Sequence, residues 1–86
     1  MELRAIQELL SEIFGEKNVK AFTKGFRVIV NYNNMPYCVV LRQEGDKIHI
    51  EKDAIDEDQE NYDEAYKMAY RLIIQNKQKF GDSLDI

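Results

Sequence analysis

The dipeptide Asn33-Asn34 separates two runs of strand-forming residues, FRVIVNY and PYCVVLRQ. Asparagine tolerates the positive φ angles that a two-residue hairpin loop requires, so we predict a tight turn here. The turn fixes the pairing register, and a slip by one residue would move every side chain to the opposite face. In this register one face of the hairpin collects the large apolar side chains as the pairs Val30–Tyr37, Val28–Val39 and Phe26–Leu41.

A second two-residue loop is predicted at Gly45-Asp46. It places Glu44 opposite Lys47, an attractive cross-strand pair, and it brings Ile50 to the same face as Leu41. Three antiparallel strands then form a meander, with YCVVLRQ in the middle. Residues 18–23 read either as a further short strand or as an extended loop.

Two amphipathic helices flank the predicted strands. The first is expected over residues 2–14 and ends before Gly15, and its apolar positions at helical spacing are Leu3, Ile6, Leu9, Leu10, Ile13 and Phe14. The second is expected to start with Asn61 as its N-cap and Glu64 completing a capping box, and to end at Gly81. Its predicted core-facing stripe comprises Tyr62, Ala65, Tyr66, Ala69, Tyr70, Leu72, Ile73 and Phe80.

Together these elements predict an α+β fold, a two-layer α/β sandwich in the order α-β-β-β-α. An antiparallel meander of three or four strands packs both helices on one face, because the helices need an apolar surface and the sheet offers one. Eighty-six residues correspond to a single domain, 1–86.

Cys38 is the only cysteine, which excludes an intrachain disulfide and favours a reducing, cytoplasmic setting. The chain holds no apolar run of the roughly 18 residues that a membrane helix needs, and its first ten residues do not resemble a targeting segment. We therefore expect no membrane partner.

The stretch DAIDEDQENYDE, residues 53–64, holds seven carboxylates and no Lys or Arg, whereas the rest of the chain has twelve Lys and Arg against nine acids. The net charge of −4 thus hides an asymmetry. Acids near a helix start gain from the helix dipole, and acids before it keep a connection solvated. The segment does not fit a calcium-binding EF-hand loop, because Asn61 stands where glycine is needed and Lys67 where a bidentate glutamate is needed.

The functional interpretation of this stretch is an acidic contact surface for a protein with a basic surface. A carboxylate-rich face on an ordered element can occupy a groove built for phosphates, so the chain could be a nucleic-acid mimic of phage or mobile-element type that blocks a nucleic-acid-handling protein. The acidic face consists of Asp53, Asp56, Glu57, Asp58, Glu60, Asp63 and Glu64.

The α-β-β-β-α order and the small-residue rhythm of DEAYKMAYRLI resemble double-stranded RNA-binding domains in topology over most of the chain. Such domains hold phosphates with a lysine cluster at the start of the last helix. This chain has acids there and has no Gly-Pro-His loop between its first strands. Binding of nucleic acid is therefore the alternative function, and it would use the outer sheet face.

The same register places a second candidate interface on the face opposite the core. This outer face combines apolar and basic side chains, and it would contact another protein or a second copy of the chain; an edge strand is the other route to a homodimer. Its residues are Arg27, Ile29, Cys38, Val40, Arg42 and His49, with Lys47 and Glu51 beside them.

The sequence gives little support for catalysis. His49 is predicted beside Arg42 and not beside Cys38, so no Cys-His nucleophile pair is indicated, and one His with one Cys does not complete a zinc site. The glycines stand apart and do not form a phosphate loop. We predict a non-enzymatic regulatory or inhibitory interaction module with no cofactor, no metal and no catalytic residues.

Overall fold

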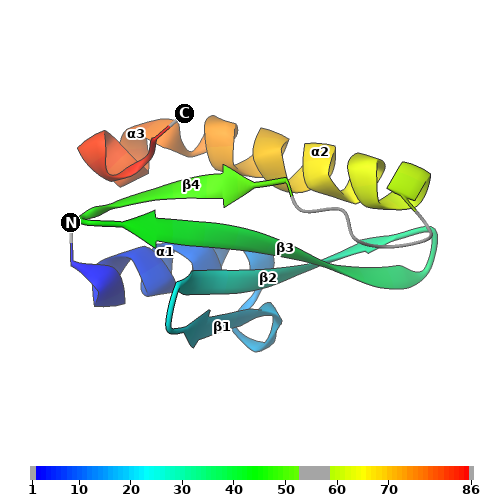
Figure 1. Cartoon of the computed structure of the whole chain (residues 1–86), viewed down its shortest axis with the longest axis horizontal. Coiled ribbons are helices and arrows are strands. Elements are labelled where there is room, and N and C mark those ends of the chain that lie inside the picture. Colours follow the sequence, from blue (N-terminus) through cyan, green and yellow to red (C-terminus); the bar gives the residue numbers. More distant parts are fainter. Residues whose placement is uncertain (1, 53–58, 86) are drawn as a thin grey trace.

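The computed structural model describes residues 2–52 and 59–85, with only the backbone of Gln59, and forms the predicted α+β sandwich (Figure 1). In chain order the elements are α1 (Leu3–Phe14), η1 (Glu16–Asn18), β1 (Val19–Phe22), β2 (Gly25–Tyr32), β3 (Met35–Glu44), β4 (Lys47–Glu51), α2 (Gln59–Gln75), α3 (Lys77–Phe80) and η2 (Gly81–Ser83).

The sheet is an antiparallel meander in the order β1-β2-β3-β4. Asn33 and Asn34 adopt φ angles of 50° and 63°, the left-handed conformation that the predicted turn requires. The register is confirmed pair by pair between β2 and β3, including Val28 opposite Val39. The pairing of Glu44 with Lys47 in β3 and β4 is confirmed as well. The β2–β3 hairpin extends beyond β1 and β4 toward the start of α2 (Figure 1).

The ambiguous stretch 18–23 contains a short strand, β1, which pairs with the first half of β2. Val19 lies opposite Val28 and is buried, whereas Phe22 lies on the other face and is half-buried. The two large apolar residues of β1 therefore lie on different faces of the sheet. This explains why the alternation of apolar and polar residues gives no clear signal in this segment.

One face of the sheet carries the core, and both long helices pack on it. The buried side chains of α1, the sheet and α2 form one cluster, in which Leu10, Val28, Val39, Leu41 and Ile73 are fully inaccessible to solvent. Burying each such side chain contributes roughly 1.5–3 kcal/mol, so this single layer between helices and sheet accounts for most of the folding drive.

The predicted start of the last helix is wrong, and the helix is interrupted before its predicted end at Gly81, where the short α3 does end. The helix begins at Gln59, so Asn61 lies inside it and is not the N-cap of a capping box. Glutamine and glutamate favour the helical state, which extends the helix toward the acidic run. At the other end the helix breaks at Asn76, whose side-chain amide donates a hydrogen bond to the carbonyl of Leu72 at 2.8 Å. Asparagine competes in this way with the helical backbone, and the short α3 follows.

The predicted aromatic stripe of α2 is only partly correct. Tyr62, Ala65, Ala69 and Ile73 are buried, as expected, but Tyr70 is 37% exposed. One residue advances a helix by about 100°, so a stripe centred on residues 65, 69 and 73 turns residues 66 and 70 toward its flank. Tyr70 thus lies on the solvent side of α2, while Tyr66 is partly buried against the core.

The C-terminal segment adds a contact that the periodic patterns do not indicate. Leu84 is buried and forms a parallel bridge with Ile48, and the amide of Asp85 donates to the carbonyl of Ile48 at 2.8 Å. This segment therefore occupies part of the free edge of β4. Edge strands covered in this way are less prone to pair with other chains.

Gly25 starts β2 at a φ of 146°, and a Cβ atom there would overlap the carbonyl oxygen of Leu41 in β3. We expect Gly25→Ala to lower the free energy of unfolding by about 3 kcal/mol, because backbone atoms cannot give way as a flexible side chain can. Chemical denaturation measures the change.

Gly45→Ala is the matched control, since Gly45 also has a positive φ, 64°, but open space where its Cβ would lie. Gly45→Ala should lower the free energy of unfolding by only about 1 kcal/mol, because alanine adopts the left-handed backbone conformation less readily than glycine. Equal losses for the two variants would show that the close approach of β2 to β3 is not the constraint.

Candidate functional site

The outer face of the sheet brings together the six side chains predicted for the second interface. The register places Ile29 beside Cys38, and Arg27 beside Val40. It also places Arg42 beside His49. The core cluster, which holds the buried side chains of both long helices, lies on the opposite face. Among the described residues, no helix packs over this outer face, so the sheet itself forms the surface.

Phe22 is a member of this face that the sequence analysis missed. The guanidinium carbon of Arg27 lies 4.5 Å from the centroid of the Phe22 ring. A cation over an aromatic face is worth roughly 0.5–1 kcal/mol at an exposed site, and it also holds the guanidinium in one place. The signal that reveals Phe22 is the two-residue loop between it and Gly25, which sets the β1–β2 register in the same way as Asn33-Asn34 sets the next one.

Two contacts of the outer face run along β3 and β4, an ion pair of Arg42 with Glu51 and a contact of the His49 imidazole with Glu44. The Nη2 atom of Arg42 lies 2.7 Å from an oxygen of Glu51, and Nδ1 of His49 lies 3.8 Å from a carboxylate oxygen of Glu44. Both pairs are partly exposed, so each contributes at most about 1 kcal/mol. Nε of Arg42 is buried and has no hydrogen-bond acceptor among the described residues, which leaves one donor of this guanidinium unused.

The sheet is basic although the chain is acidic. Residues 19–52 hold six Lys and Arg against three acids, whereas the whole chain has a net charge of −4. The cations on the outer face are Lys20, Arg27, Arg42 and Lys47. The outer face therefore attracts carboxylates or phosphates, unlike the remainder of the chain.

The Cys38 thiol reports on the electrostatics of this surface. Partial burial raises the pKa of the Cys38 thiol, because desolvation disfavours the thiolate, and the positive charge of Arg27 acts in the opposite direction. The residue is exposed and carries no disulfide. Its raised pKa makes it a poor nucleophile near neutral pH.

The predicted acidic face is only partly within the described residues, since Asp53, Asp56, Glu57 and Asp58 lie outside them. The other three carboxylates belong to the first turns of α2. Oδ1 of Asp63 lies 3.4 Å from Nζ of Lys52, and Oε1 of Glu64 lies 3.3 Å from Nζ of Lys67. These local pairs reduce the negative charge that α2 offers to a partner.

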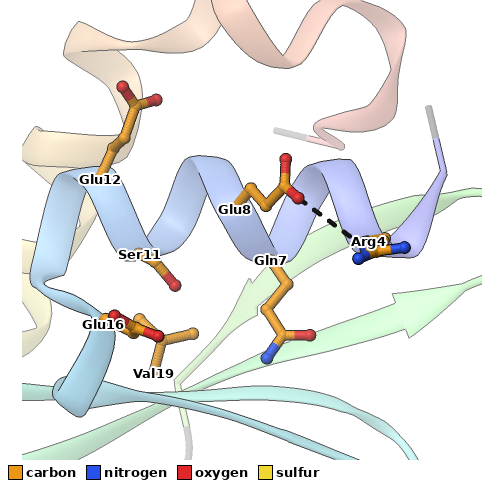
Figure 2. A pocket seen from close by; sticks show the side chains of 7 residues that line it. All are labelled: Arg4, Gln7, Glu8, Ser11, Glu12, Glu16 and Val19. Atoms are coloured by element: carbon orange, nitrogen blue, oxygen red, sulfur yellow. Dashed lines mark ion pairs between the residues drawn. The ribbon is translucent and has the colours of Figure 1, made fainter.

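A groove of about 620 Å³ lies between the exposed side of α1 and the start of β1 (Figure 2). Gln7 and Ser11 project from α1 toward Glu16 and Val19, while Glu12 points away from them (Figure 2). Nε of Arg4 and a carboxylate oxygen of Glu8 form a loose pair at 3.9 Å. The lining combines three carboxylates with the guanidinium of Arg4, the amide of Gln7 and the hydroxyl of Ser11.

Two further findings concern only residues 2–52 and 59–85. No helix in these ranges is both long enough and apolar enough to cross a membrane. Their His, Cys, Asp and Glu side chains do not gather into any group of three or more that could hold a metal ion.

No protein-family model, curated protein or solved structure matches this chain. The surfaces of the structure itself are therefore the basis for a functional proposal.

The pKa of Cys38 provides a test of the outer-face geometry. We expect Arg27→Gln to raise this pKa further, because the variant removes the charge that favours the thiolate. The pH dependence of iodoacetamide alkylation measures it, and at a fixed mildly alkaline pH the variant should react more slowly. Lys47→Gln, a change at a more distant cation of the same face, should leave the profile in place. An unchanged or lowered pKa in Arg27→Gln would contradict the proximity of the two side chains.

Proposed function

We propose that the protein is a small non-enzymatic interaction module of regulatory or inhibitory type, which binds another protein through the outer face of its sheet. The observation that carries this proposal is the assembly, on an uncovered sheet face, of an apolar centre (Ile29, Cys38, Val40) within a basic rim. Aromatic residues and arginine are the residue types enriched in protein interfaces, and this face has Phe22, Arg27 and Arg42.

The charge of the sheet defines the chemistry of the partner. A complementary surface presents carboxylates around an apolar centre, because the cations of the outer face surround Ile29, Cys38 and Val40. Arg27 is held over Phe22 before a partner arrives, which lowers the entropy cost of immobilising its long side chain on binding.

The outer face is a better-supported contact surface than the acidic face. Of the seven predicted acidic residues, four lie outside the described residues, and two of the remaining three form ion pairs within the chain. Mimicry of nucleic acid by residues 53–64 thus stays a prediction, which charge reversal at Asp56, Glu57 and Asp58 would test.

The double variant Arg27→Glu/Val40→Asp should abolish partner capture while the fold persists, since both positions lie on the face opposite the core. Loss of an apolar anchor together with a charge reversal should weaken binding by roughly 100-fold or more. The measurement is quantitative mass spectrometry of proteins cross-linked to the tagged chain in its native cell extract.

The matched control is the double variant Gln78→Asp/Lys79→Glu on α3, which makes the same total change of charge at exposed positions on the helix side of the molecule. Capture must survive in this control and disappear in the outer-face variant. Equal capture by both variants would show that the outer face is not the contact surface.

Binding of nucleic acid is the second candidate function, and the stacking of Arg27 on Phe22 within a basic face favours it. The acids Glu44 and Glu51 on the same face, already paired with His49 and Arg42, oppose it. If this function is correct, single- or double-stranded oligonucleotides bind at low salt and the affinity falls steeply as salt rises. Fluorescence anisotropy measures this, and no binding at low salt would eliminate this candidate.

A further inference from the structure

We infer that α2 forms an antiparallel homodimer contact with α2 of a second copy of the chain. This inference is independent of the outer sheet face and rests on the solvent side of the helix. The contact surface is the α2 flank, defined as Tyr66, Lys67, Tyr70, Arg71 and Ile74, which line a groove of about 540 Å³.

The α2 flank carries apolar side chains in an ordered arrangement. Tyr70 is exposed, whereas Tyr66 is partly buried against the core, with Nζ of Lys52 5.7 Å from its ring centroid. Tyr66, Tyr70 and Ile74 recur every four residues, so they form a continuous row along the helix. The rings of Tyr66 and Tyr70 are stacked, with centroids 6.2 Å apart and an interplanar angle of 29°. Tyr70 is 37% exposed although it is a large aromatic residue of a helix that buries its opposite side. A row of this kind on an amphipathic helix is suited to packing against another helix.

The acidic and the basic side chains of α2 and α3 are separated along the chain. This separation identifies a second copy of the chain as the partner of the α2 flank. Glu60, Asp63 and Glu64 are the acids of these helices and all precede the cations Lys67, Arg71, Lys77 and Lys79. A second copy lying antiparallel places its cationic half against the acidic half of the first copy. It also places its acidic half against the cationic half of the first copy. The helix dipoles favour the same orientation. The surface is thus complementary to itself, as a contact with two-fold symmetry requires.

One symmetry axis satisfies both the charged and the aromatic contacts. Within α2, residues 64 and 71 are centred on position 67.5, and residues 66 and 70 on position 68. An axis beside Lys67 and Met68 therefore brings Glu64 to Arg71 of the second copy and Tyr66 to Tyr70 of the second copy. Arg71 makes no ion pair with any described residue, so its guanidinium is available for this contact.

Lys67 lies beside its own symmetry mate in this arrangement. Its ammonium group pairs with Glu64 of the same helix at 3.3 Å, which reduces the repulsion without removing it. The position of the axis thus makes Lys67 and Arg71 opposite in effect: Arg71 attracts the second copy, and Lys67 repels it. Both are exposed, and both carry one positive charge.

The arrangement leaves the outer sheet face of each copy free, because α2 packs on the core face of the sheet. A dimer would present two such faces to partners. If a partner is itself multivalent, the two faces can raise the apparent affinity by a factor on the order of 10² or more without any new contact.

The two exposed cations give a first test by sedimentation velocity over a concentration series. We expect Arg71→Gln to weaken the dimer by about fivefold and Lys67→Gln to strengthen it by a similar factor, although both variants remove the same charge. Weakening by both variants, or by neither, would overturn the assigned axis. A wild-type chain that remains a monomer at about 1 mM would overturn the dimer itself.

A charge-swap experiment tests the antiparallel orientation. The acidic variant Arg71→Glu/Lys77→Glu and the basic variant Glu60→Lys/Glu64→Lys should each be monomeric alone, because each repels its own copy. Mixed in equal amounts, they should form a heterodimer that native mass spectrometry resolves. Far-UV circular dichroism confirms that each variant is folded, and a mixture of folded variants that stays monomeric would overturn the antiparallel contact.

Cys38 separates this dimer from one formed by the outer face. A short bismaleimide should not cross-link the wild-type dimer through Cys38, since this residue lies on the face opposite the core. It should cross-link the variant Cys38→Ser/Lys67→Cys efficiently, because position 67 lies next to the axis and packed helices are about 8–10 Å apart. Efficient cross-linking through Cys38 would place the contact on the outer face and contradict the inference.

Discussion

The pairing of β2 with β3 is the constraint on which the rest of the structure depends. The left-handed Asn33 and Asn34 close the hairpin in one register, and this register sorts the side chains of the two longest strands onto two faces. Val28, Val39 and Leu41 enter the core, whereas Arg27, Cys38 and Val40 remain outside it. A slip by one residue would bury Arg27 and expose Val28, which no packing of the helices could offset.

The same alternation produces both the stability and the candidate function. The helices can cover only one face, and they cover the apolar one because burial of apolar surface drives folding. The cations of the sheet are consequently gathered on the uncovered face, where they stay at least partly exposed to water. An acidic chain thus carries a basic sheet face, with Arg27 held over Phe22. Self-association through α2 would combine two such surfaces in one particle.

The parts that could be predicted from the sequence are those set by strict periodicity. The Asn33-Asn34 and Gly45-Asp46 loops, together with alternating strands, specify three strands and place the six side chains predicted for the second interface on the outer face. The 3.6-residue period specifies both long helices and the face of the sheet that they cover. These signals are unambiguous because each is supported by turn chemistry and by burial together.

The remaining features depend on contacts that a periodic pattern does not contain. The break at Asn76 follows from one side-chain hydrogen bond, and the bridge between Ile48 and Leu84 joins residues far apart in the sequence. The contact of Arg27 with Phe22 requires the register of β1, whose four residues are too short for a clear alternation. The exposure of Tyr70 reflects the rotation of α2 about its axis, which tertiary packing determines and composition does not.

The central claim is that the outer face of the sheet is open to a partner in the folded protein. The most direct measurement is the labelling of Cys38 by a bulky maleimide under native conditions, followed by intact-mass analysis and circular dichroism. Because Cys38 is exposed at the centre of this face, every folded molecule should take up one label without loss of secondary structure. Protection of Cys38 until urea unfolds the chain would show that the face is covered, and it would contradict the proposed contact surface.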